Sequence, residues 1–195
     1  MGLSKYKLGE LLEQCDERNT ELQYSVNDVK GMSVQKNFIE TKANMTGVSL
    51  TPYKLVKNNE FAYVTVTSRN SEKITLAYNN TPNTYIVSSS YIVFKIKQTA
   101  FMSSDYLFMY FNRPEFDRYA RFASWGSARE TFDWDEMCDV KIPIPPLATQ
   151  QSIVNIYNAY MERKRINEQL KEQLKNICPI LIKGSLEEAA QRKDA

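Results

Sequence analysis

The proline-rich stretch at residues 141–154, KIPIPPLATQQSIV, constrains the fold of this chain more than any other. Its three prolines hold the backbone extended, because each fixes its own φ and disfavours the α region for the preceding residue. A run with helical spacing follows at once, and Thr149 is a suitable N-cap for a helix that starts at Gln150. The pattern therefore predicts an extended clip that joins a globular part to a long helix without slack, and that holds the helix away from that part.

The helical run repeats a narrow stripe in alternating steps of three and four residues, which is typical of a coiled-coil seam. From Gln150 to Cys178 it would span roughly 40–45 Å at about 1.5 Å per residue. Such a helix cannot bury its stripe alone, so it needs a partner helix, either in its own chain or in another. The seam positions are Ile153, Ile156, Tyr160, Arg163, Asn167, Leu170, Leu174, Ile177 and Leu181.

We predict that six of these residues pack in a dimer, namely Ile153, Ile156, Tyr160, Leu170, Leu174 and Ile177. Arg163 and Asn167 are polar positions in the seam that would cost stability but could set its register. Pro179 is expected to kink or end the helix, and the polar tail that follows is expected to fray. The predicted organisation is a globular domain over residues 1–146, a helix over 147–183 and a tail over 184–195.

Residues 1–146 carry strand and turn signals with short helices, so the expected fold class is α+β. Strands are predicted at 61–67, 74–78 and 85–96, and shorter ones between 24 and 56. The opening residues resemble a short amphipathic turn or helix. Ser103 or Ser104 can cap a helix over 106–111, and Pro114 suits the first turn of a second helix.

Apolar side chains in this second helix, Phe116, Tyr119 and Phe122, recur at helical spacing. Arginines at 113, 118 and 121 fall between them. Two interpretations are open: the arginines form a solvated face, or some of them contact phosphate.

The composition argues against most enzyme chemistry. The chain has no histidine, which removes Ser-His-Asp triads, Cys-His pairs and zinc sites with histidine ligands. It has no GxxxxGK[ST] or GxGxxG loop for nucleotide phosphates. Its three cysteines are far apart and indicate neither a disulfide framework nor a metal site. We therefore predict no catalytic residue and no metal site.

Neither the net charge nor the hydropathy of the chain identifies a binding partner. The net charge is +2, and the first 149 residues hold 17 basic and 17 acidic side chains. A nucleic-acid site must therefore come from local clustering. No apolar run approaches the roughly 18 residues of a membrane span, and the N-terminus lacks a signal-peptide core, so we expect a cytoplasmic protein with no membrane partner.

Taken together, SSSYIVFKI, DYLFMYFNRPEF, the Arg-bearing turn, IPIPPLATQQSIV and the long helix resemble a type I restriction–modification specificity subunit. The likeness covers roughly residues 4–185 and one half of such a subunit, a single target-recognition domain with its spacer helix. The family typically follows the proline clip with a Glu-Gln pair, where this chain has Thr149, Gln150 and Gln151.

The resemblance implies a non-catalytic subunit that reads double-stranded DNA and holds methylation subunits on it, with a restriction subunit in the full complex. S-adenosylmethionine, ATP and Mg²⁺ would belong to those partner chains, and this chain would hold no cofactor. A half-length chain would pair through its helix as an antiparallel homodimer and favour an interrupted palindrome. A recombination cassette, a truncated gene or a fragment is equally compatible with the length.

No family motif marks the DNA-reading residues, so we choose them by chemistry. Arg and Lys bind guanine or phosphate, Asn and Gln bind adenine, and Ser and Thr bind either. Candidate loops are 31–44, 66–73 and 123–130. The predicted DNA-binding residues are Lys36, Lys42, Arg69, Asn70, Lys73, Ser127 and Arg129, with Trp125 shaping the surface.

Two other hypotheses compete with this interpretation. The first is a coiled-coil adaptor whose β-rich domain binds protein without DNA specificity. The second is a small nuclease that uses Asp139 and Lys141, which match half of a common nuclease motif without its upstream Pro-Asp partner.

Overall fold

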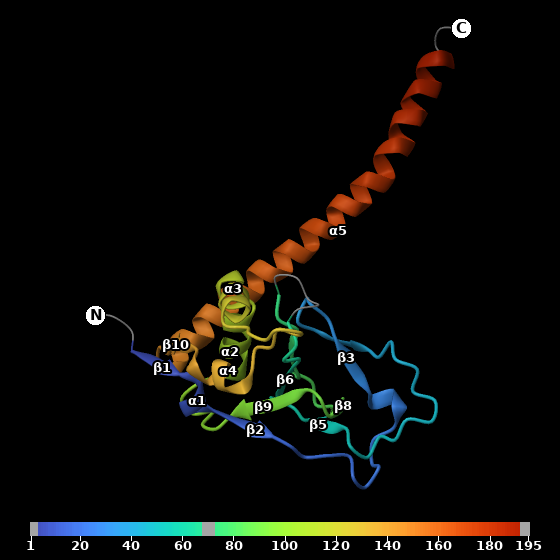
Figure 1. Ribbon diagram of the computed structural model, residues 1–195. Helices are drawn as coiled ribbons and strands as arrows, with labels where there is room; N and C mark the ends of the chain where they lie inside the picture. The colour runs from blue at the N-terminus through green and yellow to red at the C-terminus, as the bar shows by residue number, and fades with distance from the viewer. Residues whose placement is uncertain (1–3, 68–72, 192–195) are drawn as a thin grey trace. The chain divides into compact units, whose positions relative to one another are not determined.

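The chain divides into two compact units, Met1–Gln151 and Ser152–Ala195. The computed structural model describes residues 4–67 and 73–191. Short strands and short helices make up the first unit, and the long helix α5, Leu147–Gln191, forms the second after a first turn that belongs to the first unit (Figure 1). This arrangement confirms the predicted α+β class with a long C-terminal helix.

The strands are short and pair antiparallel. They are β1 Lys5–Lys7, β2 Leu12–Cys15, β3 Lys30–Met32, β4 Phe38–Glu40, β5 Lys54–Val56, β6 Phe61–Tyr63, β7 Leu76–Tyr78, β8 Tyr85–Val87, β9 Ile92–Ile96 and β10 Lys141–Pro143. Within the described residues they form a four-stranded sheet in the order β2-β9-β6-β7 and the two-stranded sheets β1-β10, β3-β4 and β5-β8.

The shorter helices lie between these strands. They are α1 Leu8–Leu11, the 3₁₀ helix η1 Val26–Asp28, α2 Ser104–Phe111, α3 Pro114–Phe122 and α4 Trp134–Asp139. Of the two predicted caps of α2, Ser103 is confirmed, because its hydroxyl accepts a hydrogen bond from the backbone N–H of Tyr106 at 3.1 Å, and the helix begins at Ser104, two residues before the predicted range. The predicted start of α3 is confirmed as well, since Pro114 is its first residue. Proline fits there because its missing N–H would have no partner within the helix.

An aromatic core joins α2 and α3 to the four-stranded sheet. Phe61 of β6 stacks on Phe94 of β9 with ring centroids 5.1 Å apart. Both rings meet the edge of Phe111 at the end of α2, and Phe111 lies 4.7 Å from Phe116 of α3. Such offset and edge-on contacts add to the burial of apolar area. This core therefore sets where α3 lies on the unit.

All three predicted strands are shorter than expected, and residues 74–78 form a strand only from Leu76 to Tyr78, as β7. Residues 85–96 are not one strand, because a turn closed by the Tyr91 N–H and the Ser88 carbonyl separates β8 from β9. Residues 61–67 begin as β6, and Val64 N–H still bonds to the carbonyl of Thr75 beside β7. From Thr65 onward the partner changes: the Thr65 carbonyl accepts from Phe132 N–H at 2.8 Å, and Thr67 N–H donates to the carbonyl of Glu130 at 2.9 Å. Strand propensity alone does not show where a chain changes partner.

The proline clip is extended, as predicted, and forms part of a sheet. Its first residues are strand β10, in which Ile142 pairs with Tyr6 of β1. The hydroxyls of Tyr106 and Tyr110, on α2, donate to the carbonyls of Pro143 and Lys141 at 2.8 and 3.2 Å. Because proline lacks an N–H, its place at the end of an edge strand leaves no ladder bond missing. The clip is thus held by the first unit along its length.

Helix α5 differs from the prediction at both ends. The carbonyl of Pro146 accepts from the N–H groups of Thr149 and Gln150, so the helix begins at Leu147, and Thr149 lies inside the first turn instead of capping it. Pro179 does not end the helix, and residues 184–191 are helical rather than a frayed tail. A proline removes one backbone hydrogen bond, and on an exposed helix water can satisfy the freed carbonyl. Figure 1 shows α5 as one continuous, curved helix.

Candidate nucleic-acid interface

Helix α3 presents one face to the core and one to solvent. Phe116 and Ala120 are buried, and Asp117 beside them is buried as well. Tyr119 is partly exposed, whereas Phe122 is 89% exposed. The helical spacing of Phe116, Tyr119 and Phe122 therefore does not extend the packed face to Phe122, which is the last residue of α3.

Asp117 connects two distant segments to α3. Its Oδ1 accepts a hydrogen bond from the Lys36 ammonium at 2.6 Å and from the backbone N–H of Ile74 at 3.2 Å. Lys36 lies in the loop between β3 and β4, and Ile74 comes just before β7. One carboxylate thus connects the first candidate loop and the end of the second to the same helix.

The prediction that Lys36 stands on an exposed DNA-binding loop is wrong, because only 3% of this residue is exposed. Its backbone takes a left-handed conformation with φ of 62°, which turns the side chain toward Asp117. Burial lowers the pKa of Lys36, while the hydrogen bond and charge of Asp117 act in the opposite direction. The Nζ also lies 5.9 Å from the ring centre of Phe116. The Lys36 ammonium therefore makes its contacts inside the protein and not on the surface.

The third candidate loop is a hairpin closed by Trp125 and Thr131, whose backbones exchange hydrogen bonds of 3.1 and 2.9 Å. Gly126 has φ of +132°, and a Cβ at that position would lie 2.2 Å from the carbonyl oxygen of Arg129. The tight turn therefore requires glycine. It leaves three of the predicted residues, Trp125, Ser127 and Arg129, on the surface.

This hairpin is tied to the second candidate loop. The Thr67 hydroxyl donates to the Ser124 hydroxyl at 2.9 Å, and the Thr67 N–H bonds to the Glu130 carbonyl. Arg121 of α3 forms an ion pair with Glu130 on the same hairpin. The ends of the second and third loops therefore meet at α3, next to the contacts of Asp117.

The remaining predicted residues fall in three classes. Lys73 is exposed, and its charge is near enough to Lys36 to help lower the pKa of that residue. Lys42 is also exposed and lies two residues after the end of β4. Arg69 and Asn70 lie outside the described residues.

The arginines of α3 are held by acidic neighbours. Arg113 and Arg118 each pair with Glu115 at 3.4 Å, and Arg121 pairs with Glu130. These pairs favour the interpretation of a solvated face for α3, because exposed ion pairs hold the guanidinium groups at little cost. In the described ranges, Arg129 has no such neighbour, so its guanidinium is free for a ligand.

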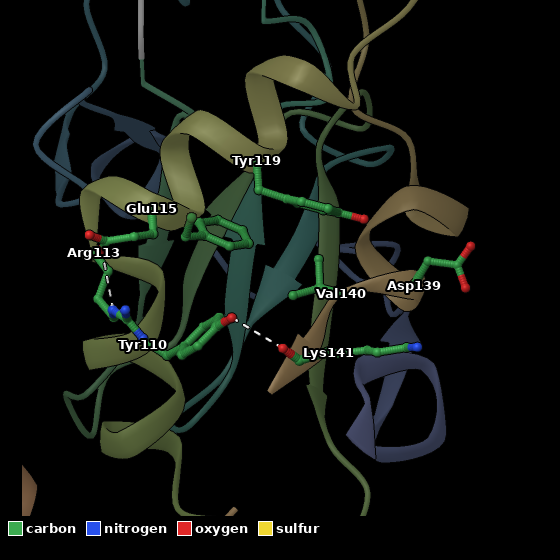
Figure 2. Close-up of a pocket in the computed structure, with 8 residues that line it drawn as sticks. Tyr110, Arg113, Glu115, Tyr119, Asp139, Val140 and Lys141 are labelled. Atoms are coloured by element: carbon green, nitrogen blue, oxygen red, sulfur yellow. Dashed lines mark hydrogen bonds and ion pairs between the residues drawn. The ribbon is translucent and has the colours of Figure 1, made fainter. Parts of the chain in front are cut away.

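A pocket of about 280 Å³ lies beside α3 and is lined by Tyr110, Arg113, Glu115, Phe116, Tyr119, Asp139, Val140 and Lys141 (Figure 2). Asp139 belongs to the nuclease hypothesis, yet its carboxylate pairs with the Lys7 ammonium at 2.6 Å. This contact lowers the pKa of Asp139. Within the described ranges, no three His, Cys, Asp or Glu side chains gather as metal ligands would.

Sequence reasoning missed Asp117 and Gln150. Gln150 is fully buried, and its side chain accepts from the Ser103 N–H at 3.0 Å and donates to the carbonyls of Phe101 and Pro145 at 2.9 and 2.8 Å. No spacing marks either residue, since both act on segments far away in the chain.

The predicted seam of α5 is exposed in the single chain from Ile156 onward. Its large apolar members include Ile156, Tyr160, Leu170, Leu174, Ile177 and Leu181. Charged neighbours outside the seam pair along the helix, as Arg165 does with Glu162 at 2.6 Å. In the part of α5 that the structure describes, the apolar stripe is uncovered. No described helix has the length and apolarity that a membrane span requires.

The comparisons with known proteins agree with this architecture. Residues 2–176 match the family described as the type I restriction modification DNA specificity domain, and the chain belongs to that family. A comparison with curated protein sequences gives no match.

Several solved structures share the fold. A chain from a structure on complex assembly and conformational transition of the type I R-M system superposes with a TM-score of 0.69 at 18% identity, over 96% of this chain and 49% of that one. The HsdS subunit from Thermoanaerobacter tengcongensis gives 0.65 at 19% identity, over 92% and 47%. The S subunit of the type I system from M. genitalium gives 0.50 at 12% identity, over 84% and 40%. The chain thus spans about half the length of these relatives.

Proposed function

We propose that this chain is a sequence-specific DNA-binding subunit of a type I restriction–modification system, with one target-recognition domain that reads one half of a bipartite target. The observation that carries the proposal is the meeting of two candidate loops at α3, which leaves Trp125, Ser127 and Arg129 exposed. A rigid scaffold that presents polar loop residues is the arrangement that base reading requires. Membership of the DNA specificity domain family supports the same assignment.

The residues that read DNA are, on this proposal, Lys73, Ser127 and Arg129, with Trp125 as an exposed apolar surface beside them. Arg129 is suited to bidentate contact with guanine, and Lys73 to phosphate. Lys42 binds DNA on this proposal from a separate loop, and Arg69 and Asn70 keep their predicted contacts. Lys36 and Asp117 hold two of the loops in place without touching the DNA.

The full reader is a homodimer that pairs through α5 as an antiparallel coiled coil. The exposed apolar stripe supports this part of the proposal, because a helix with such a stripe gains stability from a second helix. A two-fold dimer presents the same loops to both half-sites, so the target is an interrupted palindrome.

The chain works without catalysis of its own and docks methylation subunits, with a restriction subunit in the complete complex. Methyl transfer from S-adenosylmethionine and ATP- and Mg²⁺-dependent cleavage take place in those partners. Membership of the type I DNA specificity domain family supports such a division of labour.

Selection from a random duplex pool tests the proposal. The purified chain is incubated with its methylation subunit, and the bound DNA is sequenced at several salt concentrations, since phosphate contacts alone give affinity without sequence preference. An interrupted palindrome is the expected result. An asymmetric split motif would contradict the homodimer, and absence of enrichment at every salt concentration would favour the protein-binding adaptor.

A further inference from the structure

Between Ile153 and Ile177, the seam of α5 has the same step pattern in both directions along the helix, and its two polar residues, Arg163 and Asn167, lie on either side of the centre. We propose that α5 binds the α5 of a second copy in one antiparallel register, centred on residue 165, in which Arg163 faces Asn167 of the partner helix. This inference rests on the proposed homodimer and adds the pairing of individual residues.

The register follows from heptad geometry. In an antiparallel pair, each a position packs in a layer with a d position of the partner helix, so only shifts by whole heptads keep the seam together. In the central register, Ile153 faces Ile177, Ile156 faces Leu174, Tyr160 faces Leu170, and Arg163 faces Asn167. From Ile153 to Ile177, every apolar side chain of the seam then meets an apolar one, and the two polar residues meet each other.

The registers shifted by one heptad are less favourable energetically. A shift of one heptad in one direction puts Asn167 against Ile156 and Arg163 against Tyr160. A shift in the other direction puts Asn167 against Leu170 and Arg163 against Leu174. Both bury polar groups without partners, which is costly. A parallel pair in register would place Arg163 beside its own copy, and like charges at such close range repel.

The side chains of the single chain agree with this assignment. Arg165, which lies outside the seam, hydrogen-bonds to Glu162 and Gln169 of its own helix. Lys171 likewise pairs with Glu168 at 3.0 Å. Within the described part of α5, Arg163 and Asn167 have no such contacts. Their guanidinium and amide groups are therefore available to each other across the dimer, twice by symmetry.

The register also determines the distance along the helix axis between the two copies of Gln150. Gln150, where the first unit gives way to the exposed helix, lies level with Ile180 of the partner helix. The two copies of Gln150 are then about 45 Å apart along the axis at about 1.5 Å per residue. A shift of one heptad would change that distance by about 10 Å.

Disulfide trapping in the full chain tests the register. Cys15, Cys138 and Cys178 are first replaced by serine. Two preparations, Tyr160→Cys and Leu170→Cys, are mixed and oxidised. A disulfide is expected in the mixture and not in either preparation alone, where the cysteines would lie about 15 Å apart. A dimer that instead links Tyr160→Cys to Arg163→Cys or to Ile177→Cys, the pairs of the shifted registers, would overturn the proposal.

A charge exchange gives an independent measurement. Asn167→Arg should weaken dimerisation at least about tenfold in sedimentation equilibrium, because two arginines then face each other. Adding Arg163→Glu should restore most of that loss, as a double-mutant cycle requires for residues in contact. Glu172→Arg, on the solvent face, is the matched control and should have no effect.

The outcomes separate the two claims. A chain that stays monomeric at all concentrations would overturn both the homodimer and its register. A dimer without rescue by the double variant would overturn the register and leave the homodimer standing. The pool selection is independent of both results.

Discussion

Asp117 is a buried carboxylate that accepts hydrogen bonds from Lys36 and from the backbone of Ile74. A buried ion pair adds little net stability, but removing one of its partners is strongly destabilising, because the other charge is then left uncompensated in the interior. Its role is to hold the loop after β3 and the start of β7 against α3. The candidate DNA-reading surface therefore depends on a residue that does not reach it.

Lys36→Met should lower the free energy of unfolding by about 3 kcal/mol, because Asp117 then stays buried without its cation. Urea unfolding measures the change. Lys42→Met makes the same substitution on an exposed side chain and should shift stability by less than about 0.5 kcal/mol. Similar losses in the two variants would contradict the buried pair.

Arg129→Ala should weaken specific DNA binding by about 1–3 kcal/mol, as expected for the loss of a bidentate base contact. Lys171→Ala, on α5, also removes one positive charge but should change specific binding little. Titration of both variants with the selected duplex compares them. If the two losses were equal, Arg129 would have no place in base reading.

At the scale of elements, the proline clip and the first turn of α5 form one joint. Strand β10 is paired with β1 and held by the hydroxyls of two tyrosines of α2. Gln150 then bonds its side-chain amide to three backbone groups of the first unit. The extended clip was predictable from its prolines. The lock, by which we mean the three hydrogen bonds of the Gln150 side chain, was not predictable, because Gln150 acts on the loop before α2.

Gln150→Ala should destabilise the first unit by about 2–4 kcal/mol, since it leaves one N–H and two carbonyl groups without partners in a buried place. Differential scanning calorimetry of the full chain would show this as a lower Tm. Asn158→Ala, on an exposed stretch of α5, is the control and should leave the Tm unchanged. An equal shift in both variants would argue against the lock.

Leu170→Asp together with Leu174→Asp should abolish pairing of α5 and leave the first unit folded, because each new carboxylate would be buried in the seam against an apolar side chain, Tyr160 or Ile156 of the second copy. Light scattering reports the mass, and near-UV circular dichroism reports the packing of the aromatic core. A variant that remained dimeric would show that the seam is wrongly assigned.

At the scale of the whole molecule, the protein is a first unit, proposed to read DNA, followed by a helix whose apolar stripe is exposed from Ile156 onward. A reader with a few base contacts discriminates weakly alone, and linking two readers raises affinity without any new contact. Pairing and DNA specificity are therefore coupled in the proposed function, although they lie on separate units.

The intact chain should bind the full palindrome about 10²–10⁴-fold more tightly than a single half-site, by the effective concentration of a linked second reader. The Leu170→Asp, Leu174→Asp variant should bind the full and half sites within a few-fold of each other. Electrophoretic mobility shifts with both duplexes measure the ratios. A preference that survives in the variant would show that pairing does not use the α5 seam.

The sequence by itself determined the features that depend on neighbours a few residues apart. The cap at Ser103, the proline start of α3, the extended clip and the period of α5 were all predictable, because backbone dihedrals and helix periodicity are local properties. So was the family, whose motifs are short and contiguous. The tertiary structure alone decided that Lys36 turns inward to Asp117, which is 81 residues away, and that Gln150 is a buried lock. Such contacts depend on which segments the sheet and its covering helices bring together, and no spacing along the chain encodes that distance.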